Sequence, residues 1–228
     1  ALELKRKEKS EKSVFDLYPQ LEKGIWVRVD IHRRENLTPV RFKAIVGSVA
    51  SLLKNGYNIN FIEMSATRNA LDYYNLRPLI NKMKKNKNFL HTSVWPEYSH
   101  VVEFFESEKC LAALTDSGGV QEELNLIGKP CLTCRFSTDR PESVFDAKSN
   151  ILVPPVSSEY ILSVIKHITN NTNLLKKMGN AKKLYGNNVG NKVISVLSRL
   201  IKKGERPFKW AHEELGLWKE TSKGVEYL

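Results

Sequence analysis

The sequence contains no run of apolar residues that approaches the length of about 18 residues needed to cross a bilayer. Most of its first ten residues are charged and no apolar segment follows them, so we expect no secretory signal peptide. The chain also lacks an initiator methionine, which is compatible with a piece cut from a longer protein and equally with the processing of a short leader. We therefore expect a cytoplasmic protein with no membrane partner.

Cysteine is scarce, with three residues in the chain. Cys131 and Cys134 have the spacing of a redox or metal pair, but no second pair completes a zinc site, and the odd count argues against a secreted disulfide scaffold. The pair lies in an apolar run after Pro130, where a strand would send the two side chains to opposite faces. We expect buried structural thiols. The sequence also shows no histidine pair with ligand spacing and no nicotinamide fingerprint, so we expect no metal and no cofactor.

Acidic residues are outnumbered, with 36 Lys and Arg against 25 Asp and Glu and a net charge of +11. Such a balance raises the hypothesis of a nucleic-acid partner, whose affinity would fall steeply with salt. The sequence carries no helix-turn-helix, zinc-finger or RNA-recognition signature, and its lysines are dispersed rather than interleaved with aromatic residues. We favour a solvated lysine-rich surface that attracts small phosphorylated anions, with no nucleic-acid partner.

Short apolar runs alternate with stretches that carry apolar residues at helical spacing, which predicts an α/β fold with a parallel sheet and helices on both faces. This is a three-layer, Rossmann-like architecture. The predicted strands are Ile25–Ile31, Ile59–Met64, Asn88–His91, Leu111–Thr115, Cys131–Arg135 and Ile151–Val153. The predicted helices are Pro39–Leu53, a weak region Leu71–Met83 interrupted by Pro78, Tyr98–Phe105, 119–127, Ser157–Ile168, Leu174–Lys183 and Val189–Ile201.

The pattern predicts three segments. Residues 1–23 are charged and carry little core, so they are interpreted as a linker or lead-in. Residues 24–201 form the Rossmann-like domain. Residues 202–228 form a polar tail, in which Trp210 and Trp218 need a surface to pack on.

Ligands of such sheets bind at the carboxyl ends of the strands. The loop after Thr115 is the most informative, because Ser117, Gly118 and Gly119 lead into a helix there. Glycines let the backbone approach a ligand, and the helix start presents free N–H groups, so this loop has the outline of a phosphate or diphosphate site. In the helix, Glu122 and Glu123 either complement the helix dipole or accept the hydroxyls of a ribose, and geometry does not decide between them.

Two further loops carry charge at the same edge. His32, Arg33 and Arg34 follow the first strand, and we favour anion binding over a simple surface cluster there. His32 can bind phosphate or transfer a proton near neutral pH. After the fifth strand, Arg135 and Arg140 can donate to phosphate or uracil oxygens, while Glu142 can orient them or take up a sugar hydroxyl. Three such loops on one edge predict a binding cleft.

In order along the chain, four motifs closely resemble the UDP-N-acetylglucosamine 2-epimerases. They are His-Arg-Arg-Glu-Asn at 32–36, Thr-Asp-Ser-Gly-Gly-Val-Gln-Glu-Glu at 115–123, Gly-Lys-Pro at 128–130 and Arg-x-x-Thr-Asp-Arg-Pro-Glu at 135–142. The resemblance covers about residues 25–200 and implies one Rossmann-like half, the C-terminal UDP-binding half, of a glycosyltransferase-B-type architecture. It also implies an isomerase of polysaccharide biosynthesis.

The resemblance implies that UDP is eliminated from the sugar to leave a 2-acetamidoglucal and is then added back with the opposite configuration at C2. Donors aimed at the departing diphosphate would stabilise the transition state. Ser117 and Gly118 would hold the diphosphate and Glu123 the ribose diol. The substrate-binding residues expected from the motifs and loops together are Arg33, Ser117, Gly118, Gly119, Glu122, Glu123, Arg135, Arg140 and Glu142, with His32 as the catalytic residue.

The chain departs from the family pattern at two places. The usual Pro-x-His is replaced by Phe61-Ile-Glu-Met64, which puts a regulatory second UDP-sugar site in doubt. Val101 occupies the register of the aromatic that would stack on uracil, and Phe104 and Phe105 lie a few residues later.

The resemblance places the carboxylates that move the C2 proton in the N-terminal half, and no strand–helix series of that kind precedes residue 25. The expected partners are therefore a UDP-sugar and this N-terminal domain, with homodimerisation left open, and the 228-residue chain alone is expected to bind UDP without epimerising it. A hydrolysing epimerase, which releases UDP and free N-acetylmannosamine, and a non-catalytic nucleotide-sugar-binding module are the alternatives.

Overall fold

The computed structural model describes residues 11–186, 188–203, 218–221 and 224–227. The chain divides into two compact units, Ala1–Tyr185 and Gly186–Leu228. The predicted segment boundaries at residues 23 and 201 stay predictions. None of the helices in these described ranges is long and apolar enough to span a membrane.

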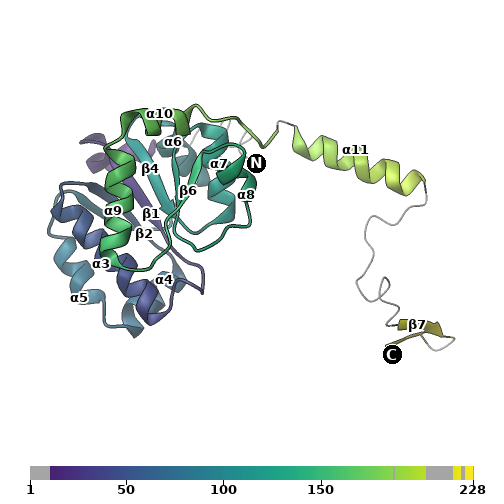
Figure 1. Ribbon diagram of the computed structural model, residues 1–228, viewed down its shortest axis with the longest axis horizontal. Coiled ribbons are helices and arrows are strands. Elements are labelled where there is room, and N and C mark those ends of the chain that lie inside the picture. The colour runs from purple at the N-terminus through teal and green to yellow at the C-terminus, as the bar shows by residue number, and fades with distance from the viewer. Residues whose placement is uncertain (1–10, 187, 204–217, 222–223, 228) are drawn as a thin grey trace. The chain divides into compact units, whose positions relative to one another are not determined.

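A six-stranded sheet forms the centre of the first unit (Figure 1). Its strand order is β3-β2-β1-β4-β5-β6, and every neighbouring pair is parallel. The order reverses between β1 and β4, which is where parallel sheets of this kind bind ligands at the carboxyl ends of their strands. The strands are β1 (Trp26–Asp30), β2 (Asn58–Glu63), β3 (Phe89–Ser93), β4 (Cys110–Thr115), β5 (Cys131–Thr133) and β6 (Asn150–Leu152).

Helices cover both faces of the sheet, because side chains alternate between the faces along each strand. In β1, Val27 and Val29 join one buried cluster while Trp26 joins the other. The first cluster is covered by α3 (Pro39–Lys54), α4 (Ser65–Tyr73), α5 (Arg77–Met83), α9 (Ser158–Thr169) and α10 (Thr172–Gly179). The second is covered by α2 (Val14–Leu17), the 3₁₀ turn η1 (Pro19–Glu22), α6 (Tyr98–Glu106) and α7 (Gly118–Ile127). The three-layer α/β prediction is confirmed.

The weak helical region predicted over residues 71–83 is two helices. α4 ends at Tyr73, and Asn75 adopts a left-handed conformation with φ of 55°. α5 then begins at Arg77 with Pro78 in its first turn, where a proline costs no hydrogen bond. Pro78 therefore marks a helix start rather than an interruption.

The charged lead-in contributes more to the core than its composition suggested. Val14 and Leu21 are fully buried against the α6 side of the sheet. A capping box at Ser13 starts α2, and Glu103 of α6 accepts hydrogen bonds from Ser13 Oγ at 2.6 Å and from the Val14 N–H at 2.8 Å. Two buried apolar side chains and one anchoring carboxylate thus fix this segment against α6. Residues 1–10 of the predicted lead-in lie outside the described residues.

The second unit contains α11 (Val189–Lys202) and an antiparallel pair, β7 (Trp218–Thr221) and β8 (Gly224–Tyr227). α11 carries the predicted apolar stripe, and none of its side chains is buried. Trp218 begins β7, whereas Trp210 lies outside the described residues.

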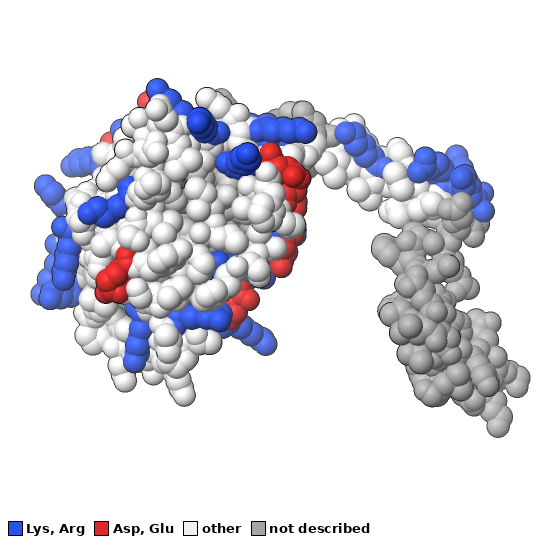
Figure 2. Space-filling model, in the orientation of Figure 1, with Lys and Arg blue, Asp and Glu red and all other residues white. Residues whose placement is uncertain are grey.

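On the face of the first unit drawn in Figure 2, Lys and Arg side chains are scattered along the rim, in keeping with a dispersed basic surface.

Candidate functional site

Asp116 joins the loop after β1 to the end of β4. Its side chain is fully buried, and it accepts hydrogen bonds from the backbone N–H of His32 at 3.1 Å, from that of Arg33 at 3.0 Å and from Asn36 Nδ2 at 2.9 Å. The Asn36 amide also donates to the Cys134 carbonyl at 2.8 Å, just after β5. One carboxylate and one amide therefore bring the three predicted loops together at the carboxyl edge of the sheet.

The same carboxylate approaches the imidazole of His32. Nδ1 lies 3.3 Å from Asp116 Oδ1, and the two atoms do not form a hydrogen bond. An acceptor on this side favours a proton on Nδ1 and leaves Nε2 as the basic nitrogen. The ring remains about one third exposed. His32 thus has the orientation of a group that can exchange a proton or bind an anion through Nε2.

The start of α7 is an anion-binding geometry. Ser117 is the N-cap, with its Oγ 3.5 Å from the Val120 N–H, and the first N–H groups of a helix have no intrahelical partner. A Cβ atom added at Gly118 would lie 3.7 Å from Arg33 Nη2 and 3.9 Å from Arg140 Cζ. Two guanidinium groups from different loops thus converge on the helix start.

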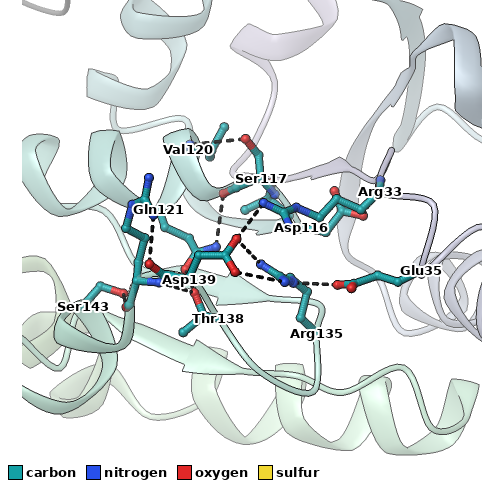
Figure 3. Close-up of polar contacts among 12 residues, drawn as sticks. Arg33, Glu35, Asp116, Ser117, Val120, Gln121, Arg135, Thr138, Asp139 and Ser143 are labelled. Carbon is teal, nitrogen blue, oxygen red and sulfur yellow. Dashed lines mark hydrogen bonds and ion pairs between the residues drawn. The ribbon is translucent and has the colours of Figure 1, made fainter. Parts of the chain in front are cut away.

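Arg135 lies deeper, with 6% of its side chain exposed. Its Nε donates to Glu35 Oε1 at 2.6 Å and its Nη1 to Asp139 Oδ2 at 3.0 Å (Figure 3). Burial acts to lower the pKa of Arg135, but the hydrogen bonds to Asp139 and Glu35 raise it overall. Arg33 Nη2 donates to the same Asp139 oxygen at 2.9 Å. Asp139 therefore bridges two of the predicted ligand-binding arginines.

The loop after β5 is held by a buried amide that sequence reasoning missed. Gln121 of α7 is fully buried, and its Oε1 accepts from Thr138 Oγ1 at 2.5 Å and from Asn150 Nδ2 at 3.0 Å. Its Nε2 donates to the Ser117 carbonyl at 3.2 Å. The short helix α8 (Pro141–Phe145), which was not predicted, completes the loop. Gln121 lies within the motif at 115–123, and this position is the sequence signal that could have identified it.

The three predicted carboxylates go to different partners. Glu122 accepts a hydrogen bond from Arg140 Nε, and Glu142 accepts one from the Tyr185 hydroxyl at 2.7 Å. Glu123 is half-buried and accepts from the Tyr98 hydroxyl, and burial raises its pKa. The structure therefore brings His32, Arg33, Ser117, Gly118 and Arg140 together around the start of α7, and turns Glu123 toward α6.

The structure also shows where the cysteine pair and the two phenylalanines of α6 lie. Cys131 and Cys134 lie in opposite core clusters, as predicted for strand geometry, and burial raises the pKa of the Cys131 thiol to about 12. Phe104 and Phe105 are buried in the core of the α6 side, so neither ring is available to stack on a base. Within the described ranges, no group of three His, Cys, Asp or Glu side chains could hold a metal ion.

Where the family pattern has Pro-x-His, the end of β2 carries a buried charge network. Glu63, 6% exposed, accepts from Arg77 Nη1 at 2.6 Å and from Arg68 Nε at 2.9 Å, and lies 2.8 Å from His91 Nε2. Burial alone would raise the pKa of Glu63, but the hydrogen bonds from Arg77 and Arg68 outweigh it and lower that pKa to about 2. The network ties β2 and β3 to α4 and α5.

Glu63→Gln is expected to lower the free energy of unfolding by about 2 kcal/mol at pH 7, because the ionised carboxylate is stabilised only in the folded state. Because the pKa of Glu63 is lower in the folded state, its carboxylate stabilises the fold at pH values above its unfolded-state pKa of about 4. This stabilisation is lost as the pH falls toward the folded-state pKa of about 2. Urea unfolding of both proteins from pH 7 to pH 2.5 measures this, with the exposed Glu11→Gln as control. A constant difference between Glu63→Gln and the unmutated protein across this range would contradict the network's role.

Comparisons of the sequence and of the structure with known proteins identify the same family. The sequence profile described as UDP-N-acetylglucosamine 2-epimerase matches residues 2–198. The UDP-N-acetylglucosamine 2-epimerase of Methanocaldococcus jannaschii is 32% identical over 171 residues, covering 74% of this chain and 43% of the relative. The chain thus spans about half the length of the relatives it matches.

Solved structures agree with this result. The Methanocaldococcus jannaschii epimerase in complex with UDP-GlcNAc and UDP superposes with a TM-score of 0.70 at 26% identity, over 87% of this chain and 51% of that one. The Neisseria meningitidis epimerase bound to UDP-GlcNAc gives 0.68 at 25% identity, over 83% and 48%. The predicted fold class, one half of a glycosyltransferase-B-type architecture, is confirmed. Because the profile matches most of its length, the chain belongs to the UDP-N-acetylglucosamine 2-epimerase family.

Proposed function

We propose that this chain is the C-terminal, UDP-binding half of an enzyme that interconverts UDP-GlcNAc and UDP-ManNAc. The observation that carries the proposal is the convergence of Arg33 and Arg140 on Gly118 at the start of α7. Relatives solved with UDP-GlcNAc or UDP support this class of ligand. A cytoplasmic location and a place in polysaccharide biosynthesis belong to the same proposal.

The diphosphate is proposed to lie against the start of α7, between these guanidinium groups. The amides of Gly118 and Gly119 and the Ser117 hydroxyl would donate to its oxygens, with Arg33 and Arg140 on either side. In the elimination step the C2–H bond and the C1–O bond break, and UDP leaves with the bonding electrons of C1–O. Donors already in place stabilise the charge that develops on the departing diphosphate.

His32 and the carboxylates have separate proposed roles. His32 Nε2 would face the diphosphate and the reacting sugar, because Asp116 occupies the Nδ1 side. Glu123 would accept both ribose hydroxyls, whereas Glu122 orients Arg140 and Glu142 completes the loop through Tyr185. The carboxylates that move the C2 proton are proposed to come from the other half of the enzyme. No metal or redox cofactor enters the proposed reaction.

Calorimetric titration of the chain with UDP tests the nucleotide site. Arg135→Ala is expected to weaken UDP binding by roughly 30-fold, since a charge-assisted hydrogen bond to a buried arginine contributes about 2 kcal/mol. Ser117→Trp is expected to abolish binding by filling the helix start. Lys85→Ala, which removes one charge at an exposed position before β3, serves as the control.

Saturable UDP binding by the unmutated chain, lost in Ser117→Trp and kept in Lys85→Ala, is the expected result. No binding at millimolar UDP would contradict the proposal. In the full-length enzyme, UDP-ManNAc as product identifies the interconverting reaction, whereas free ManNAc with UDP would identify a hydrolysing enzyme instead.

A further inference from the structure

Asp139 occupies a central place among the arginines of the site, although the motif that contains it predicted no role for it. Its Oδ2 accepts from Arg33 Nη2 at 2.9 Å and from Arg135 Nη1 at 3.0 Å, and its Oδ1 lies 3.5 Å from Arg135 Nη2 (Figure 3). The two arginines come from loops about 100 residues apart in the chain, so one carboxylate joins the β1 loop to the β5 loop. A carboxylate held by two guanidinium groups has the contacts that a phosphate group would make.

The Asp139 carboxylate and the proposed diphosphate share one donor, the guanidinium group of Arg33. Arg33 reaches Asp139 with the same Nη2 atom that lies 3.7 Å from a Cβ built at Gly118. That nitrogen is therefore close both to the start of α7 and to the Asp139 carboxylate. An anion bound at the helix start competes with Asp139 for Arg33.

Release of Asp139 exposes its carboxylate to water and leaves Arg135 in place. Half of the Asp139 side chain is exposed, so water can solvate the carboxylate once it is released. Arg135 keeps its hydrogen bond from Nε to Glu35, which fixes the guanidinium plane without Asp139. A diphosphate carries more charge than one carboxylate and contacts several donors at once. We therefore expect the arginines to bind the diphosphate in preference to the Asp139 carboxylate.

We propose that the Asp139 carboxylate takes the place of a phosphate group between Arg33 and Arg135, and that a nucleoside diphosphate displaces it from both arginines. The inference rests on the proposed function, because it assigns the phosphate-binding part of that same site. Asp139 holds both arginines oriented and reduces the affinity for every ligand whose phosphates need them. It thereby acts on the phosphate end of the ligand and not on the nucleoside.

Asp139→Asn keeps the size of the side chain and removes its charge. UDP and inorganic pyrophosphate are expected to bind about fivefold more tightly to this variant, since two partly exposed ion pairs no longer compete. The affinity for uridine is expected to stay unchanged. Asp146→Asn, which removes the same charge from an exposed position at the end of α8, is expected to leave all three affinities within twofold.

Titration calorimetry of the three proteins with the three probes distinguishes the outcomes. Weaker or unchanged pyrophosphate binding in Asp139→Asn would overturn the inference, because Asp139 would then only organise the site. An equal gain in Asp146→Asn would also overturn it and assign the effect to net charge. A third outcome separates the two proposals. If pyrophosphate bound more tightly to Asp139→Asn while none of the three proteins bound UDP more tightly than pyrophosphate, the inference would be supported and the proposed nucleotide specificity contradicted.

Discussion

Asp116→Asn is expected to lower the free energy of unfolding by about 3 kcal/mol and to weaken UDP binding at the same time. The fully buried carboxylate accepts from two backbone N–H groups and from the Asn36 amide. An asparagine offers one acceptor oxygen and turns an NH₂ group toward a remaining donor, and each buried donor left without an acceptor costs about 1–3 kcal/mol. The loop that carries His32 and Arg33 then loses its fixed position.

Urea unfolding at pH 7 measures the loss of stability, and UDP titration measures the loss of affinity in the fraction that folds. The exposed Asp146→Asn is the control and is expected to stay within about 0.5 kcal/mol of the unmutated protein. If Asp116→Asn unfolded at the same urea concentration as the control, the buried carboxylate would not be the link between the loops.

The strands and helices could be predicted because their signal is local. Apolar residues at a spacing of two or of three to four lie within each segment, so β1 and α3 were found to within one residue at each end. The loops that carry the predicted site residues could be placed at the carboxyl edge of the sheet for the same reason, because three of the four motifs are short runs of residues at or directly after the end of a strand.

What could not be predicted depends on partners distant in the chain. Arg28 and Asp30 are charged residues in a central strand, yet both are buried, because Arg28 Nε pairs with Asp30 at 3.3 Å and Thr115 donates to the same carboxylate. Likewise, the bridge between Arg33 and Asp139 and the burial of Val14 against α6 join segments roughly 100 residues apart. The spacing of apolar residues within one short segment of the sequence carries no information about such contacts.

Gly118→Asp is expected to abolish UDP binding without destabilising the fold. A Cβ at this position meets no atom closer than 3.7 Å, and an acidic residue in the first turn of a helix is favourable by up to about 1 kcal/mol. The new carboxylate would lie against Arg33 and Arg140 and occupy the place proposed for the diphosphate. Two like charges about 4 Å apart near a protein surface repel by about 4 kcal/mol, which corresponds to a loss of roughly 1,000-fold in affinity.

Gly118→Asn is the matched variant, because asparagine has the shape of aspartate without its charge. We expect Gly118→Asn to retain measurable UDP binding, at least tenfold tighter than Gly118→Asp, while both variants unfold at or above the urea midpoint of the unmutated protein. Titration calorimetry and urea unfolding of the two variants give these values. Equal affinities in the two variants would mean that only the space at Gly118 matters, and the anion would then lie elsewhere than between Arg33 and Arg140.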